Sequence, residues 1–359
     1  MDTNRREFVA GATAALASAF VPPVPAQGQR RQPNILFIMA DDVGFADLGA
    51  YGRRDYQTPV LDRLAAEGLL MTRGYSNAPS CSPTRVSLIT GRYHQRLPVG
   101  LPEPIRTRTL DPVGLPEGQS TLPGLLKAAG CRTALVGKWH MGWPPEHSPL
   151  RHGYEHFFGT ASAAVEYFTH RENDPSGQGA GGLFEGDEVV EREGYLTELL
   201  ADRAVQEIRA AAEISKPFLL SLHFTAAHWP WQGPNSGPLP PGTDLWHFDG
   251  GNWQIFGAMI RSMDAAIGRV LEQLDRSGAT NDTIVIFTSD NGGERFSDTW
   301  PLRGGKRDLL EGGIRVPVIV RWPRAIAPWQ ALGPGDRVDG LVAHLACGRG
   351  RICRLEIST

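Results

Sequence analysis

The stretch N-I-L-F-I-M, residues 34–39, is a continuous apolar run that leads directly to Asp41 and Asp42. A run of this kind is typical of a strand that is buried on both faces of a sheet. Similar runs occupy residues 133–137, 218–224 and 283–288. Helical periodicity is found at residues 58–68, 121–129, 196–212 and 252–275. Buried strands that alternate with helices predict an α/β fold: a three-layer sandwich in which helices cover both faces of a mostly parallel central sheet.

Oxygen-bearing side chains stand where two of these runs end. Asp41 and Asp42 follow the first run, and Asp290 and Asn291 follow the last. The carboxyl ends of parallel strands meet at one edge of a sheet, where ligands bind. Adjacent carboxylates repel each other unless a cation lies between them, so we expect a metal site. Several carboxylates favour Ca²⁺ over Mg²⁺, whereas Asp41 and Asp42 taken alone also fit a solvated turn.

A second stretch, S-C-S-P-T-R-V-S-L-I-T-G-R at residues 80–92, predicts a short helix with Cys81 at its mouth. Pro83 suits the first helical position, and Gly91 suits the position just past the helix end. The free N–H groups of such a helix attract an anion, and Arg85 adds a fixed planar charge one turn further in. The alternative is that Cys81 is a small buried hydrophobic residue before an ordinary helix.

Basic residues follow other strands. Lys138 and His140 are two apart on an extended segment, which places an ammonium and an imidazole side by side. Such a pair also fits two polar side chains that simply face solvent. His228 lies past the end of the 218–224 run, at the ligand-binding edge. His223 lies within that run and is expected to be a core histidine. Three further histidines lack metal-ligand spacing and are expected to be structural: His147, His152 and His156.

Six segments between Asn34 and about Pro323 resemble, in order, the signature segments of the type I sulfatases, which have the alkaline phosphatase-like fold. They are N-I-L-F-I-M-A-D-D-V-G, C-x-P-x-R followed by L-x-T-G-R, G-K-W-H, A-H-W-P, L-R-G-G-K and E-G-G-I-R-V-P. The fourth departs from the family pattern, because Ala227 replaces a proline before His228. This change affects the stiffness of the loop more than its chemistry.

The resemblance implies a sulfuric ester hydrolase that cleaves aryl or carbohydrate sulfates. Cys81 would be converted to formylglycine, whose hydrate attacks sulfur, and Arg85 together with the metal would stabilise its oxyanion. The sulfate oxygens would be held by Lys138, His228 and Lys306, with His228 or Lys306 protonating the leaving alcohol and His140 acting as the final base. The implied metal ligands are Asp41, Asp42, Cys81, Asp290 and Asn291.

Two other functions stay open at this point. Hydrolases of phosphate or phosphonate esters can share this scaffold and metal layout. A catalytically silent anion-binding protein is the second alternative, because the resemblance stops after Trp322-Pro323 and residues 331–359 look like a truncated or frame-shifted tail. We therefore expect a catalytic domain at residues 27–330, and loops at residues 97–118, 161–194 and 231–251 that determine which ester is bound.

Composition limits the partners. The chain has 359 residues, a net charge of -3 and no long like-charge run, so nothing indicates nucleic-acid binding. Its four cysteines are too few and too widely spaced for a disulfide scaffold. Asn4-Arg5-Arg6 and the apolar stretch that follows resemble a twin-arginine export signal cleaved after about Ala26, too short for a stable membrane anchor. The expected partners are the twin-arginine translocon, a formylglycine-generating enzyme and a sulfated small molecule or saccharide, in the periplasm or outside the cell.

Overall fold

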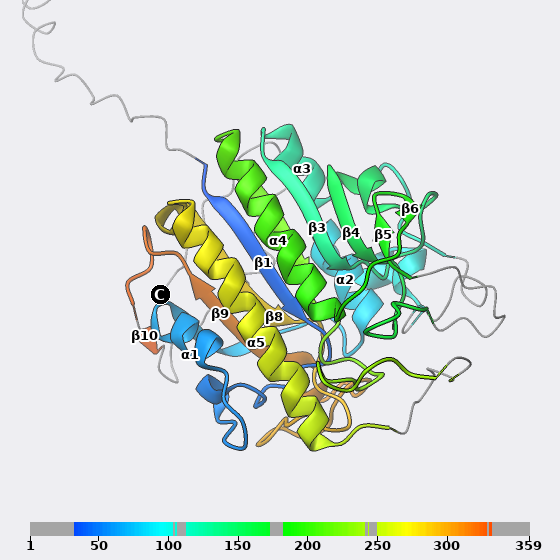
Figure 1. The fold of residues 1–359 in the computed structure, drawn as a ribbon, viewed down its shortest axis with the longest axis vertical. Helices are drawn as coiled ribbons and strands as arrows, with labels where there is room; N and C mark the ends of the chain where they lie inside the picture. The colour runs from blue at the N-terminus through cyan, green and yellow to red at the C-terminus, as the bar shows by residue number, and fades with distance from the viewer. Residues whose placement is uncertain are drawn as a thin grey trace, which may run out of the picture. The chain divides into compact units, whose positions relative to one another are not determined.

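The computed structural model describes residues 32–102, 105, 113–172, 182–240, 243, 250–328 and 330–331. From Pro33 onward the described chain is built around one sheet, which Figure 1 shows across its width. Its strands are β1 (Asn34–Ala40), β2 (Leu69–Tyr75), β3 (Arg132–Lys138), β4 (His156–Thr160), β5 (Phe184–Glu185), β6 (Glu188–Val189), β7 (Phe218–His223), β8 (Thr283–Ser289), β9 (Arg315–Arg321) and β10 (Gln330–Ala331). The predicted export signal lies outside the described residues, as does the predicted tail apart from Ala331.

The strand order is β10-β2-β9-β8-β1-β7-β3-β4-β5-β6. The five strands from β8 to β4 in this order are mutually parallel, whereas β9 is antiparallel to both β8 and β2. Antiparallel strands also close the other edge, where β5 pairs with β4 and β6. The predicted mostly parallel sheet is therefore confirmed, with β1 at its centre.

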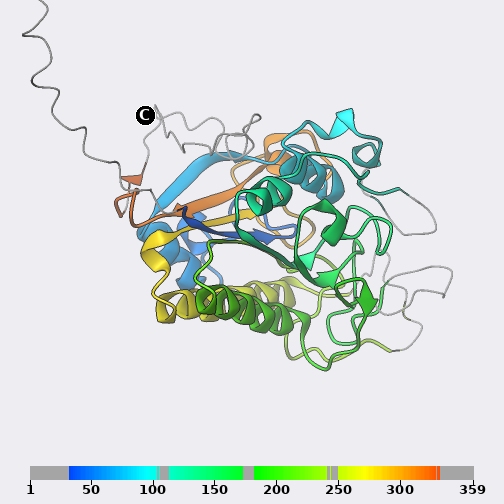
Figure 2. The ribbon, with the colours of Figure 1, turned by 90° about the horizontal axis from the view of Figure 1, so that it is seen from above.

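Helices cover both faces of the sheet (Figure 2). One layer holds α1 (Pro59–Ala66), α4 (Leu196–Glu213) and α5 (Trp253–Arg276), and the other holds α2 (Cys81–Thr90) and α3 (Leu122–Ala128). A single turn, α6 (Glu311–Ile314), leads into β9. Short 3₁₀ turns lie in the connections: Gly49–Tyr51, His94–Arg96, Pro98–Gly100, Pro149–His152 and Thr280–Asp282.

Strand β1 shows why the decisive stretch is apolar throughout. Leu36 and Ile38 point into the core beneath α4 and α5, whereas Ile35 and Phe37 point into the core beneath α2 and α3. Successive side chains of a strand face opposite sides, so a strand covered on both faces needs an apolar residue at every position. The same burial extends to Asp41 and Asp42, which are 0% and 1% exposed.

Two helix boundaries differ from the prediction. Pro83 is the third residue of α2, not its first, and Ser80 is the residue before the helix. Pro83 is still tolerated, because the N–H groups of the first helical turn have no partner within the helix. Gly91 ends α2 as predicted, in a left-handed conformation with φ of 62°. Helix α1 ends at Ala66, two residues before the end of the predicted range 58–68, and at Gly68 a Cβ would lie 2.3 Å from the Val320 carbonyl oxygen, so close strand approach explains this glycine.

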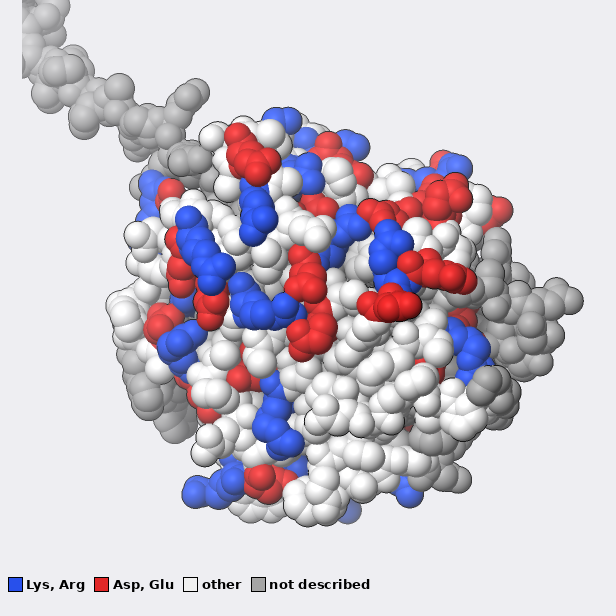
Figure 3. Space-filling model, viewed as in Figure 1, with Lys and Arg blue, Asp and Glu red and all other residues white. Residues whose placement is uncertain are grey.

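Charges of both signs are interspersed on the face formed by α4 and α5 (Figure 3). Arg269 Nη1 on α5, for example, lies 2.6 Å from Asp202 Oδ1 on α4.

Within the part of the chain that the structure describes, we find no helix with the length and apolar character needed to cross a bilayer.

Candidate active site

The candidate site lies at the carboxyl edge of the central strands. Asp41 and Asp42 follow β1, Asp290 follows β8, Lys138 ends β3 and His228 follows β7. These strands are neighbours and run in the same direction, so their carboxyl ends bring together residues that are far apart in the chain. The structure thus brings the predicted site residues together at this edge.

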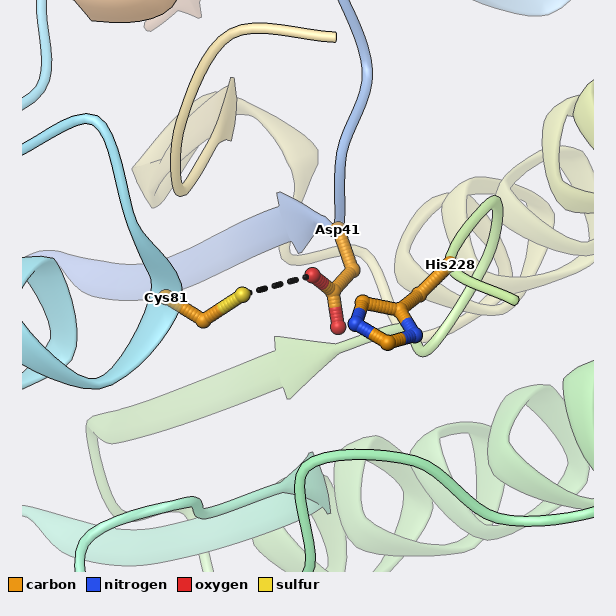
Figure 4. A group of neighbouring side chains, drawn as sticks. All are labelled: Asp41, Cys81 and His228. Carbon is orange, nitrogen blue, oxygen red and sulfur yellow. Dashed lines mark hydrogen bonds between the residues drawn. The ribbon is translucent and has the colours of Figure 1, made fainter. Parts of the chain in front are cut away.

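Cys81 is the first residue of α2 and is completely buried. Its Sγ lies 3.4 Å from Asp41 Oδ1 and 4.0 Å from Asp42 Oδ1. Figure 4 shows the thiol and the His228 imidazole on opposite sides of the Asp41 carboxylate. Burial, together with the charges of Asp290 and Asp41, raises the pKa of the Cys81 thiol well above its usual value. The thiol is therefore protonated, and as a thiol it is a poor nucleophile.

Arg85 and Lys138 hold one side of the cluster. Arg85 donates to Asp290 Oδ2 from Nε (3.1 Å) and Nη2 (2.8 Å), and to the Lys138 carbonyl oxygen from Nη1 (2.8 Å). The Lys138 ammonium donates to Asp41 Oδ2. These side chains are all essentially inaccessible to solvent, so each charge needs its partner.

Lys306 holds the other side. Its Nζ lies 2.7 Å from Asp42 Oδ2 and 3.7 Å from Glu294 Oε2. Burial disfavours the charged lysine, but the charge of Asp42 outweighs it and raises the pKa of Lys306. Burial likewise opposes ionisation of Asp42, yet Lys306 and Lys138 lower its pKa below the usual value.

Asp41 behaves in the opposite way. Burial and the nearby Asp290 carboxylate raise the pKa of Asp41 to about 7, although Lys138 opposes this shift.

Ligand atoms of four residues lie within 4.8 Å of one another in this cluster: Asp41, Asp42, Cys81 and Asp290. So many acidic groups in one buried space fit a divalent cation that neutralises them.

Asn291 completes this donor set. Its Nδ2 donates to Asp42 Oδ1 (2.7 Å) and to the Gly292 carbonyl oxygen (2.8 Å). Its Oδ1 is buried and has no hydrogen-bond partner within the described structure. A buried amide oxygen without a donor is costly unless something binds it, and a metal ion meets this need. The residues present therefore fit a hard-cation site.

His228 presents one imidazole nitrogen to the cluster. Its Nδ1 lies 2.6 Å from the Trp229 carbonyl oxygen, which only accepts, so Nδ1 carries the proton and Nε2 is the free nitrogen. Nε2 lies 3.7 Å from Asp42 Oδ2. Burial and the charges of Lys306 and Lys138 lower the pKa of His228 well below its usual value.

His140 does not lie beside Lys138 in the way expected of an extended segment. Strand β3 ends at Lys138, and His140 has a left-handed backbone with φ of 57°. Its Nε2 donates to the Ile105 carbonyl oxygen at 2.6 Å, so the buried Nδ1, which has no partner in the described part of the chain, carries the lone pair. Burial and the charges of Lys138 and Arg85 lower the pKa of His140 well below its usual value.

The other histidines contact groups outside the carboxylate cluster. His147 Nδ1 lies 3.2 Å from the Leu115 carbonyl oxygen, and His152 stacks on Trp139 at 5.6 Å. His156 opens β4. His223, expected to be a satisfied core residue, is only partly so: Nδ1 lies 3.2 Å from the Lys138 carbonyl oxygen, but the buried Nε2 has no partner among the described residues.

Several groups at the site were missed in the sequence. Glu294 approaches Lys306, and Ile105 provides the carbonyl oxygen for His140. Glu294 carried a usable signal, since it directly follows Asn291-Gly292-Gly293. Ile105 carried none, because it acts through its backbone within a stretch predicted only as a loop.

The fold is of the alkaline phosphatase-like type, and its buried cluster is a candidate hard-cation site at the carboxyl edge of the sheet. Residues 33–346 match the sulfatase family. The chain is 37% identical over 301 residues to mouse arylsulfatase J, covering 81% of this chain and 48% of that protein. It is 33% identical over 331 residues to human N-acetylgalactosamine-6-sulfatase, covering 85% of this chain and 60% of that protein. The chain belongs to the sulfatase family.

Solved structures agree with this assignment. The crystal structure of Ps i-CgsB in complex with k-i-k-neocarrahexaose is similar with a TM-score of 0.72 and 29% identity, covering 83% of this chain and 67% of that one. The PsFucS1 sulfatase from Pseudoalteromonas sp. gives a TM-score of 0.66 and 29% identity, covering 84% and 64%. The chain spans between about half and about two thirds of the length of the curated relatives above.

Proposed function

We propose that this protein hydrolyses sulfate monoesters at the carboxyl edge of its sheet. The observation that carries the proposal is the placement of Cys81 at the start of α2 with its Sγ 3.4 Å from Asp41, between carboxylates that are held by Lys138 and Lys306. A helix N-terminus and three buried cations, the third being Arg85, form an environment that stabilises an anion bearing several oxygens. A sulfate group has this character.

Asp41, Asp42, Asp290 and Asn291 would hold the metal, with Ca²⁺ favoured by the all-oxygen side chains. Formylglycine made from Cys81, when present with the metal, supplies a hydrated aldehyde that attacks sulfur. The buried Cys81 supports this modification indirectly, because its raised pKa leaves an unmodified thiol almost uncharged. Arg85 fixes the orientation of Asp290 through two N–H groups and so keeps this carboxylate aimed at the cluster.

The remaining residues divide binding and proton transfer. Lys138 and Lys306 are placed to donate to sulfate oxygens, because their nitrogens surround the carboxylates next to Cys81, and His228 Nε2 can donate with them once it is protonated. Lys306 Nζ, which its raised pKa keeps charged, gives a proton to the leaving alcohol, or His228 Nε2 does so after the bound sulfate anion has raised the low pKa of this imidazole and Nε2 has gained a proton. His140 Nδ1 accepts a proton in the step that releases sulfate, since its lowered pKa keeps this nitrogen unprotonated.

Sulfated saccharides are the proposed substrate class. Two similar proteins support this choice by name, one an N-acetylgalactosamine-6-sulfatase and the other a structure solved with a neocarrahexaose. An aryl sulfate is the simplest probe, because the released phenol is detected directly. The anion site does not by itself distinguish sulfate from a phosphonate ester, so matched aryl esters of both kinds belong in the test.

The test uses the full chain produced together with a formylglycine-generating enzyme and supplied with Ca²⁺. We expect sulfate release from aryl and saccharide sulfates, slower turnover of the matched aryl phosphonate, and no turnover by the Cys81→Ala variant. Faster turnover of the phosphonate would reassign the protein to the sister class of hydrolases. Sulfate binding without release of the alcohol, even in a single turnover, would make it a silent anion-binding protein.

Mass spectrometry tests the modification separately. Trypsin cleavage after Arg73 and Arg85 gives a peptide that runs from Gly74 to Arg85 and contains Cys81. Its mass should fall by the difference between CH₂SH and CHO. A preparation that hydrolyses sulfate esters fully while this peptide carries only unmodified cysteine would refute Cys81 as the source of the nucleophile.

The proposal includes export through the twin-arginine translocon to the periplasm or beyond. It is motivated by Arg5-Arg6 and the apolar stretch after them. Changing both arginines to lysine should keep the protein in the cytoplasm, as shown by cell fractionation. Unchanged fractionation of this variant would exclude that route.

A further inference from the structure

Tyr167 lies against the loop that carries His228. Its hydroxyl oxygen is 2.7 Å from the Thr225 carbonyl oxygen and 3.0 Å from the His228 carbonyl oxygen. Both are acceptors, so the single hydroxyl proton is shared between them. Thr225 also accepts from the His228 N–H at 2.8 Å. The hydroxyl therefore holds both ends of the short turn that begins at Thr225 and ends at the histidine.

The loop has a second anchor on its other side. The Asp41 N–H donates to the Ala226 carbonyl oxygen at 2.9 Å, and the Ala227 N–H donates to the Asp41 carbonyl oxygen at 2.7 Å. These bonds fix the two residues before His228 to the strand that ends in the metal-binding carboxylates. They do not reach the carbonyl group of His228 itself, which accepts from Tyr167.

Tyr167 is itself held rigidly. Its ring is buried and stacks on Tyr195 at 5.5 Å, and its backbone N–H donates to Gln232 Oε1 at 3.0 Å. Gln232 in turn donates from Nε2 to Glu166 Oε1 and to the Gly237 carbonyl oxygen. This network joins the segment after β4 to the segment that continues from His228.

Glu166 anchors the network as an ionised carboxylate that has no salt-bridge partner among the residues the structure describes. It is 0% exposed, and its oxygens accept from uncharged donors on three other residues besides Gln232: Phe168, Thr169 and Leu239. Burial would raise the pKa of Glu166, but these hydrogen bonds lower it below its usual value. A buried charge held this way by neutral donors fixes the surrounding backbone, because any movement would leave it unsatisfied.

We propose that Tyr167, held by Glu166 and Gln232, is a positioning residue that aims the His228 imidazole at the reacting group. The inference rests on the proposed function, in which His228 touches the sulfate or the leaving oxygen. By fixing the His228 carbonyl group, Tyr167 fixes the backbone from which both the imidazole and the Trp229 carbonyl oxygen project. The hydrogen bond from Nδ1 to that oxygen keeps Nε2 directed toward Asp42. Loss of the Tyr167 hydroxyl should therefore loosen Nε2 without removing it.

The test is the Tyr167→Phe variant of the full chain, produced with formylglycine and Ca²⁺. We expect kcat for a saccharide sulfate to fall about tenfold, with a smaller loss for an aryl sulfate, because a phenol leaves with less help from a proton. KM should change about twofold or less, since the sulfate is still held by Lys138 and Lys306. In a His228→Ala background the same change should cost nothing further, because the residue it positions is absent.

A matched control is available in Tyr154→Phe. Tyr154 is another buried tyrosine. Its hydroxyl donates to Ser221 Oγ at a distance of 2.9 Å, and Ser221 is not part of the His228 loop. It should lower the melting temperature about as much as Tyr167→Phe does and leave kcat unchanged. Equal kcat losses in both variants, or a full additional loss from Tyr167→Phe in the His228→Ala background, would reduce Tyr167 to general stability and overturn the proposal.

A second measurement does not depend on turnover. In protein with ¹⁵N-labelled histidine, the His228 resonances are identified by their absence in His228→Ala. Wild-type protein should show the proton on Nδ1, whereas Tyr167→Phe should show exchange between the two tautomers. Identical His228 resonances in both proteins would overturn the proposal. A wild-type protein that shows the expected resonances but releases no sulfate would contradict the proposed function and leave the positioning by Tyr167 standing.

Discussion

Lys306 and Asp42 lie 264 positions apart in the chain and form a buried ion pair with Nζ 2.7 Å from Oδ2. The lysine side chain is 3% exposed and the aspartate side chain 2%. Neither charge can be solvated if the other is removed, so each residue depends on the other for its stability in the site. Lys138 and Asp41 stand in the same relationship, which gives each of the adjacent carboxylates its own lysine.

Replacing Lys306 with methionine tests whether Asp42 depends on this ion pair. The variant leaves Asp42 buried without its partner, and we expect the free energy of unfolding to fall by about 3–5 kcal/mol in metal-free protein. Ca²⁺ should reduce this deficit, because the cation supplies the missing positive charge. Urea unfolding with and without Ca²⁺ measures both effects.

The matched control is Arg276→Met. Arg276 pairs with Glu272 on the exposed surface of α5, at 3.1 Å. Solvated pairs of this kind contribute little, so its unfolding midpoint should equal that of the wild type. A Lys306→Met protein as stable as the control would show that Asp42 is not dependent on the lysine.

Gly137 provides a prediction about the placement of Lys138. It has φ of 118°, and a Cβ there would lie 1.8 Å from the His223 carbonyl oxygen of the neighbouring strand. We expect Gly137→Ala to force β3 away from β7, lower the melting temperature strongly and abolish activity. Gly52 has nearly the same φ, 116°, with nothing within 4 Å of the added Cβ.

Gly52→Ala therefore isolates backbone strain from lack of space. It should cost about 1–2 kcal/mol, the penalty of a left-handed conformation for a residue with a side chain. Calorimetric melting of the two variants compares them directly. Similar losses in both would mean that strain, and not the contact with His223, explains Gly137.

Asp264 should make stability depend on pH. Its carboxylate accepts the N–H groups of Val60 and Leu61 at the start of α1, at 3.0 and 2.8 Å. Burial nevertheless raises the pKa of Asp264 from 3.8 to about 6. Because the folded protein then binds this proton more tightly than the unfolded chain, the contribution of Asp264 to stability is greatest below pH 3.8. It decreases as the pH rises to about 6 and is constant above that.

The size of this effect is roughly 3 kcal/mol, from 1.36 kcal/mol per pKa unit. Urea unfolding of wild type and Asp264→Asn at several pH values gives the difference between them, which should change between about pH 4 and pH 6 and stay level above. Asp202→Asn, on the exposed surface of α4, should track the wild type. A constant difference between wild type and Asp264→Asn across the whole range would refute the raised pKa.

Asp290→Ala tests the metal site. The variant removes one ligand and the single oxygen, Oδ2, that accepts from both Nε and Nη2 of Arg85, so we expect loss of stoichiometric metal and of activity. In the wild type, Ca²⁺ at about a hundred times its Kd should add about 2.7 kcal/mol to the free energy of unfolding. The variant should gain almost nothing. Native mass spectrometry that finds zinc in the wild type, or unchanged Ca²⁺ content in the variant, would contradict the assignment.

The central sheet was predictable because burial on both faces demands a continuous apolar run, and β1, β3, β7 and β8 all contain one. The site edge followed from this, since parallel neighbours end together. Strands β2, β4 and β9 were not predicted. The direction of β9 is antiparallel, and direction is set by the connection between strands and not by the apolar character of the strand.

The loops explain what else was missed. Tyr167 reaches His228 only because Glu166 and Gln232 hold two loops together through side-chain hydrogen bonds. Such bonds have no sequence period, unlike the spacing of buried residues in α5. Residues that bind the substrate directly could therefore be proposed from the sequence, whereas the residues that aim them needed three-dimensional coordinates.

The distribution of the site along the chain has a consequence for its synthesis. Asp42 and Asn291, which share a hydrogen bond, are separated by 249 positions. The ribosome therefore makes the first residues of the carboxylate cluster long before the last ones. During that interval Asp41, Asp42 and Cys81 lack Asp290, Asn291 and Lys306. The proposed metal site is thus complete only after β8 has been added beside β1, so we expect tight metal uptake to be a late marker of completed folding.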